Sequence, residues 1–93
     1  MACAVVSVHS PEPEFRDAVL DSMQRYSSVA RRQPGSVWTG IVDGSGEELV
    51  GVAVRVSEAA ADAASPALMA EVGADPFSEW DRKPVRTVRG AVR

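Results

Sequence analysis

The sequence contains one cysteine and one histidine among its 93 residues, and aromatic residues make up only 5% of the chain. A lone thiol, Cys3, excludes a disulfide within the chain and leaves no cysteine–histidine motif for a metal ion. A single free thiol is typical of a reducing compartment. We therefore expect a cytoplasmic protein without a bound metal.

Long hydrophobic runs and a surplus of basic residues are also absent. No apolar stretch approaches the roughly 18 residues of a membrane-spanning helix, and no basic segment precedes the apolar N-terminal residues as in a signal peptide. The net charge of −3 argues against nucleic acid, whose binding needs a clustered positive surface. Arginine far outnumbers lysine, which occurs once, at Lys83, and this bias suggests a GC-rich bacterial genome.

The chain length suits a single domain over residues 1–93. A domain of this size buries only about 60–65% of the surface that its unfolded chain exposes. Neither a disulfide nor a metal reinforces so small a core. Association of subunits is the remaining source of buried area, so we expect an oligomer.

Hydrophobic periodicity and turn signals predict the secondary structure. Short valine-rich or alternating runs favour strands, and apolar steps of three and four favour helices. A glycine-rich turn over 43–47 joins two strands into a hairpin. The predicted elements are a strand over 2–9, a helix over 14–32, strands over 36–43 and 48–56, a helix over 58–73 that breaks or kinks at Pro66, a helical turn capped by Asp75 that begins at Pro76, and a strand over 85–93.

The stretch that ends the first helix has a defined role. Arg31 and Arg32 suit the negative end of the helix dipole, Pro34 cannot continue the helix, and Gly35 permits a left-handed backbone. The resulting order is strand, helix, strand, strand, helix, strand, the pattern of ferredoxin-like α+β domains. We predict a four-stranded antiparallel sheet with both helices on one face.

Alternation along the hairpin strands predicts what each sheet face carries. We place the uniformly apolar set Val50, Val52, Val54 and Val56 against the helices. The open face then carries Leu49, Gly51, Ala53 and Arg55, together with Trp38, Gly40 and Val42. Because such a face is too apolar to be left to water, we predict a homodimer that pairs sheet to sheet. A cavity would lie between helices and sheet, or inside the closed barrel.

Two segments resemble the antibiotic biosynthesis monooxygenase family of the dimeric α+β barrel superfamily. Residues 31–38, RRQPGSVW, are similar to its helix end and PG entry into the second strand, and residues 56–68, VSEAAADAASPAL, are similar to its strand-to-helix segment. The resemblance implies a dimeric α+β barrel. It also implies cofactor-independent oxygenation, in which protein groups deprotonate a phenolic or enolic substrate whose carbanion reduces oxygen.

The sequence also departs from that family. Asp62 stands where members commonly carry a histidine, and Arg55 and Val56 replace an aromatic at the end of the third strand. Haem-degrading relatives use an asparagine on the first strand, near the position of Ser7 here, and a haem-ligating histidine on the second helix. Residues 68–73, LMAEVG, contain no histidine. We therefore expect neither haem nor any other cofactor.

Polar candidates for a site lie at the ends of strands. His9, where the first strand ends, can act as a general base or be a solvated strand-end histidine. Ser7 lies on the same strand face and can form a polar pair with it. Arg55 can stabilise an anionic substrate or form a salt bridge between subunits.

Aromatic candidates have a packing alternative. Trp38 and Trp80 can form a wall for a planar ligand, or they can pack in the core or at the subunit interface. Tyr26 falls on the apolar helix face, with its hydroxyl at the edge, and can line the same binding site.

Together these features predict a small-molecule-binding barrel that resembles cofactor-independent monooxygenases acting on phenolic or polyketide-like substrates. His9 would be the base, Arg55 the anion stabiliser, and Trp38, Ser7, Trp80 and Tyr26 would bind substrate. Two alternatives stay open. One is a non-catalytic binding or structural barrel with a degenerate site, and the other is an isomerase or cyclase on the same scaffold.

Overall fold

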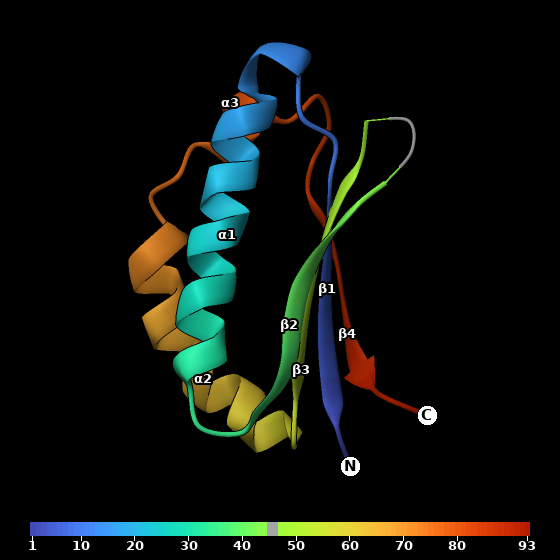
Figure 1. The fold of residues 1–93 in the computed structure, drawn as a ribbon, viewed down its shortest axis with the longest axis vertical. Helices are drawn as coiled ribbons and strands as arrows, with labels where there is room; N and C mark the ends of the chain where they lie inside the picture. Colours follow the sequence, from blue (N-terminus) through green and yellow to red (C-terminus); the bar gives the residue numbers. More distant parts are fainter. Residues whose placement is uncertain (45–46) are drawn as a thin grey trace.

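The computed structural model describes residues 1–44 and 47–93, and it has the predicted element order (Figure 1). The elements are β1 (Cys3–His9), a 3₁₀ turn η1 (Pro13–Phe15), α1 (Arg16–Arg32), β2 (Ser36–Asp43), β3 (Leu49–Arg55), α2 (Glu58–Val72), α3 (Phe77–Trp80) and β4 (Arg86–Ala91). No helix of the described part is long and apolar enough to cross a membrane.

The four strands form one antiparallel sheet in the order β2-β3-β1-β4. Both long helices lie against the same face of this sheet, and Figure 1 shows the opposite face free of helices. The ferredoxin-like α+β fold is therefore confirmed. The tip of the predicted turn over 43–47, residues 45–46, lies outside the described residues.

The turn from α1 into β2 depends on Gly35. Its φ is +83°, in the left-handed region, and an added Cβ would lie 2.8 Å from the Cβ of Ala60. Its carbonyl accepts a hydrogen bond from the amide of Val56 at 2.8 Å, which fixes the start of β2 against the end of β3. The glycine is thus required both by conformation and by space.

The second helix begins as the sequence indicates but does not break. The hydroxyl of Ser57 accepts a hydrogen bond from the amide of Ala60 at 3.1 Å, and Gly73 follows the last turn. α2 is continuous through Pro66, and its ribbon bends between the yellow first turns and the orange last turns (Figure 1). The short α3 begins one residue later than predicted, because Asp75 makes no cap and binds α1 instead.

The predicted assignment of the faces of β3 is wrong. Leu49, Ala53 and Arg55 are buried beneath the helices, and they pair with the helix-facing residues of β1. Val50, Val52 and Val54 lie on the open face. Both faces of this strand are almost entirely apolar, so hydrophobicity alone does not set its parity. The predicted set Trp38, Gly40 and Val42 does lie on the open face, opposite Val54, Val52 and Val50.

The open face is apolar, as predicted, although partly with different residues. Trp38, Val42 and Val88 keep 53%, 50% and 59% of their surface exposed. The indole of Trp38 lies over Gly40, where an added Cβ would come within 2.5 Å of the ring. The face also carries Ala4, Val6 and Val8 of β1 and the three valines of β3.

The core beneath the helices is divided. One buried cluster joins Val19 and Met23 of α1 to Leu49 of β3, and a second joins Ala30 of α1 to Ala64 and Leu68 of α2. Small residues occupy much of the sheet between these clusters, including Ser7 and Gly51, which face each other across β1 and β3. This division leaves space between helices and sheet.

Candidate functional site

A cavity of about 320 Å³ lies between α1 and the sheet, and we call it the His9 cavity. Ser7 and His9 of β1 line one side, and Tyr26 of α1 lies on another. Most other lining groups are apolar, among them Met23 and Ile41. The chamber suits a small apolar molecule held by a few polar groups.

A second cavity of about 370 Å³, the Arg55 cavity, extends from the same place toward α2 and β4. It shares Ser7, Tyr26 and Gly51 with the His9 cavity. Its own lining includes Arg55 and Ser65. The predicted space between the helix layer and the sheet is therefore present in the single chain.

His9 is buried and has a carboxylate partner. Its Nδ1 lies 3.3 Å from Oδ2 of Asp81, whose side chain is 1% exposed. Because a carboxylate accepts hydrogen bonds, this contact favours the tautomer with its proton on Nδ1. Nε2 then carries the lone pair, and no side chain or backbone group among the described residues hydrogen-bonds it. A base oriented by a third group is a recurring arrangement in catalytic sites.

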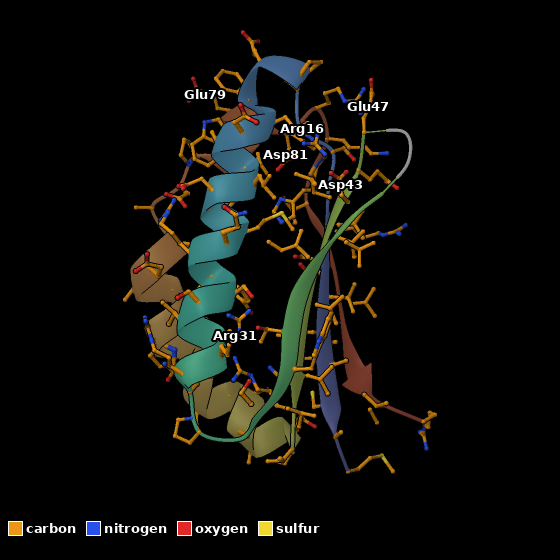
Figure 2. All side chains as sticks on the ribbon, in the orientation of Figure 1. Arg16, Arg31, Asp43, Glu47, Glu79 and Asp81 are labelled. Carbon is orange, nitrogen blue, oxygen red and sulfur yellow. The ribbon has the colours of Figure 1, made fainter. Side chains whose placement is uncertain are left out.

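Backbone pairing brings Asp81 to the end of β1. The amide of Glu12 donates to the carbonyl of Trp80 at 2.8 Å, and the amide of Arg82 donates to the carbonyl of Ser10 at 2.9 Å. Pro11 and Asp81 form an isolated antiparallel bridge between them. Figure 2 shows Asp81 between the helices and the sheet, at the end of the molecule where Arg16 and Asp43 lie.

Aromatic packing completes the surroundings of the imidazole. The Phe77 ring lies 5.2 Å from the His9 ring, centroid to centroid, and it lines the His9 cavity. Trp80 packs edge-on against Phe77 at 5.7 Å and contacts the cluster around Val19. Trp80 therefore supports the wall from behind and is not among the residues that line the cavity.

Arg55 lies in a different place from the one predicted. It is 1% exposed beneath the helices, so it does not lie on the open sheet face. A salt bridge between subunits across that face is therefore excluded. Its Nη1 donates to the carbonyl of Ala30 at 2.7 Å, near the C-terminal end of α1. Its Nη2 is buried without a hydrogen-bond partner among the described residues.

Tyr26 lies where the two cavities meet. Burial raises the pKa of its hydroxyl above the usual value, and the nearby charge of Arg55 offsets part of this effect. The side chain is half-buried and lines both chambers. Tyr26 therefore presents a protonated hydroxyl to a ligand at neutral pH.

Trp38 does not line either cavity of this chain. It lies on the open face of the sheet, on the other side from His9 and Arg55. The same alternation that exposes its indole directs Thr39 and Ile41 toward the helices. Within one chain Trp38 is 53% exposed, so it neither lines a cavity nor packs in the core.

The predicted site residues do not include Asp81, Phe77 or two serines of α1, Ser22 and Ser27. Ser22 donates to Oδ2 of Asp75 at 2.5 Å, and Ser27 shares a hydrogen bond of 3.0 Å with Thr39. Serines that recur on the apolar face of a helix were a signal for a polar-lined cavity. No signal marked Asp81, because its contact with His9 spans 72 positions.

Among residues 1–44 and 47–93, no group of three or more histidine, cysteine, aspartate or glutamate side chains is arranged to hold a metal ion. The acidic side chains of this part instead form scattered ion pairs, as between Asp43 and Arg16 at 2.6 Å. The chemistry available at the cavities is that of an imidazole, hydroxyls and a guanidinium.

No family model and no curated protein matches the sequence. Solved structures do match over nearly the whole chain. A conserved protein from Methanosarcina mazei Go1 is 16% identical, with a TM-score of 0.86 and coverage of 100% of this chain and 94% of its own. A variant of SnoaB, a cofactor-independent oxygenase from Streptomyces nogalater, is 16% identical, with a TM-score of 0.81 and coverage of 99% and 93%.

A putative antibiotic biosynthesis monooxygenase from Nitrosomonas europaea is 13% identical, with a TM-score of 0.78 and coverage of 98% of this chain and 89% of its own. At these low sequence identities, the similarity shows a shared fold and nothing about activity. The chain therefore has the fold of antibiotic biosynthesis monooxygenase-like proteins, as the resemblance of its two segments implied.

Proposed function

We propose that this protein is a cytoplasmic homodimer that oxygenates a small phenolic or enolic molecule without a cofactor, with His9 as the general base. The observation that carries the proposal is the buried contact between His9 and Asp81 at the wall of a cavity of ligand size. The fold shared with a cofactor-independent oxygenase supports the scaffold.

The reaction needs a group that removes and returns a proton. Nε2 of His9 takes a proton from an activated CH₂ of the substrate, and the resulting carbanion transfers electrons to O₂. A C–O bond forms and gives a peroxide. His9 returns its proton to the outer oxygen of the peroxide and then removes the second proton of that carbon, which cleaves the O–O bond, leaves a carbonyl and expels hydroxide. The imidazolium then protonates the hydroxide. One oxygen atom enters the product and the other leaves as water.

The other groups of the site have supporting roles in this proposal. Asp81 holds the tautomer and stabilises the imidazolium formed when His9 is protonated. Ser7 and Tyr26 supply hydroxyls that bind the substrate oxygen, and the apolar lining excludes bulk water from the carbanion. Trp80 acts through Phe77, and Trp38 acts at the interface between subunits.

The homodimer is proposed from the open sheet face. Trp38, Val42 and Val88 belong to one apolar surface that extends across all four strands. Monomeric proteins rarely leave such a surface in contact with water. Pairing of two copies through this face buries it and leaves both helix layers, with their cavities, on the outside.

Oxygen uptake with a panel of phenolic and enolic compounds tests the function. We expect uptake with a subset of the panel and a fall in kcat of about 100-fold or more in His9→Gln. Substrate consumed without oxygen uptake would identify an isomerase or cyclase instead. Full activity in His9→Gln would overturn the role of the base, and binding without turnover across the panel would favour the non-catalytic barrel.

A further inference from the structure

Arg55 is a buried cation without a carboxylate partner among the described residues. Its charge is held beneath the helices at 1% exposure, whereas Arg89, which lines the same cavity, pairs with Asp62 at 2.6 Å. A buried charge is costly unless an opposite charge or several hydrogen bonds compensate it. The arrangement around Arg55 supplies only part of that compensation.

The compensation that exists comes from α1. Nη1 donates to the carbonyl of Ala30, which belongs to the last turn of the helix, where the dipole is negative. This contact fixes the orientation of the planar guanidinium. Nη2 keeps its donors unused by the described residues, and Arg55 lines the cavity together with the hydroxyl-bearing Ser65 and Thr87.

We propose that the Arg55 cavity binds an anionic group of the ligand, specifically a carboxylate. A guanidinium with a fixed plane and free donors matches the geometry of a carboxylate, and hydrogen bonds between charged groups are stronger than neutral ones. The neighbouring apolar groups, Leu68 and Ala61, suit a carboxylate attached to an aromatic or aliphatic body.

This inference extends the proposed function. It rests on that function only for the statement that the ligand is the substrate of the enzyme. His9 pairs with Leu49 across the sheet, and Arg55 lies six residues further along β3, which corresponds to about 20 Å of strand. The anion therefore lies far from the carbon that His9 deprotonates. The substrate class is an elongated aromatic acid, with its carboxylate at Arg55 and its enolic or phenolic part at His9.

A pair of isosteric probes tests the site by equilibrium binding, without any turnover. The probes are 2-naphthoate and its neutral analogue 2-naphthamide, titrated against the full chain. We expect the carboxylate to bind about tenfold or more tightly than the amide. Arg55→Gln should abolish this preference, and Arg32→Gln, which removes an exposed arginine at the end of α1, should keep it.

A second variant decides the question even if Arg55→Gln does not fold. Ser65 is exposed on α2 and lines the cavity, so Ser65→Asp places a competing carboxylate near the guanidinium with little risk to the fold. We expect it to remove the preference for naphthoate, while the neutral control Ser65→Asn retains it. Equal affinity of the two probes in the unmodified protein, or an unchanged preference in Ser65→Asp, would overturn the proposal.

The two proposals fail independently. His9→Gln should keep the preference for the carboxylate, because Arg55 alone provides it. Full turnover in His9→Gln together with the expected preference would overturn the catalytic role of His9 and leave the anion site established. Loss of the preference in His9→Gln would overturn the assignment of the anion to Arg55.

Discussion

Oδ2 of Asp81 lies 3.3 Å from Nδ1 of His9, with both side chains buried at one end of the space between helices and sheet. The contact orients the imidazole and gives the proposed base a carboxylate partner. The segment after α3 crosses back to the end of β1, and this crossing places the carboxylate beside the imidazole. The remaining oxygen of Asp81, Oδ1, has no hydrogen-bond partner among the described residues.

Removal of the Asp81 charge should slow the reaction without weakening ligand binding. In Asp81→Asn the amide no longer stabilises the imidazolium, so we expect kcat to fall by about tenfold or more while KM changes little. The matched control is Asp43→Asn, which removes an exposed carboxylate at the same end of the molecule. A pH profile of kcat that is identical in Asp81→Asn and the unmodified protein would exclude a positioning role.

A methyl group at Gly51 should obstruct both cavities. Its Cβ would lie 2.9 Å from Oγ of Ser7 and 3.3 Å from Cε of Met23, at the place where the two chambers meet. We expect Gly51→Ala to weaken ligand binding by about tenfold while the free energy of unfolding changes by no more than about 1 kcal/mol. Gly90→Ala, whose Cβ meets nothing within 4 Å, is the control, and titration and urea denaturation provide the measurements.

A charge on the open sheet face should separate the subunits. Trp38 is 53% exposed in the single chain, and Trp38→Lys would place an ammonium in the largely apolar surface of the proposed interface. We expect a monomer in sedimentation velocity at micromolar concentration. Met69→Lys removes an equally exposed apolar side chain, 59% exposed, from α2 and should remain dimeric. A monomeric unmodified protein would contradict the interface.

Deprotonation of Tyr26 at alkaline pH should lower the free energy of unfolding. Its folded-state pKa is raised by burial, so the folded chain retains a proton that the unfolded chain loses. This contribution is fully present below about pH 10 and is lost as the pH rises through the folded-state pKa. We expect the free energy of unfolding to fall more steeply with alkaline pH in the unmodified protein than in Tyr26→Phe. Because the chain has one tyrosine, tyrosinate absorbance measures this pKa directly.

Much of the fold could be predicted from the sequence because its signals are local. The stop at Pro34 and Gly35, the cap at Ser57 and the periodicity of α1 each act within a few residues. Those signals set the number, type and order of the elements, and the order limits the topology to very few arrangements. The candidate base His9 was visible for the same reason, since it ends a strand.

The parity of β3 and the partner of His9 could not be predicted. Both faces of β3 are apolar: helices cover one, and the other is the open face of the sheet. The alternation of residues along the strand therefore does not indicate which face points toward the helices. The burial of Arg55 depends on a helix carbonyl, that of Ala30, which accepts a hydrogen bond from Nη1 at 2.7 Å. Such compensation exists only once α1 and β3 are packed together.

The sequence by itself determined the elements, their order and the apolar open face, because these follow from the period and composition of short segments. The tertiary structure alone decided that Asp81 lies beside His9 and that Arg55 points beneath the helices. Each of these depends on contacts between residues far apart in the chain, whose energies no local pattern contains.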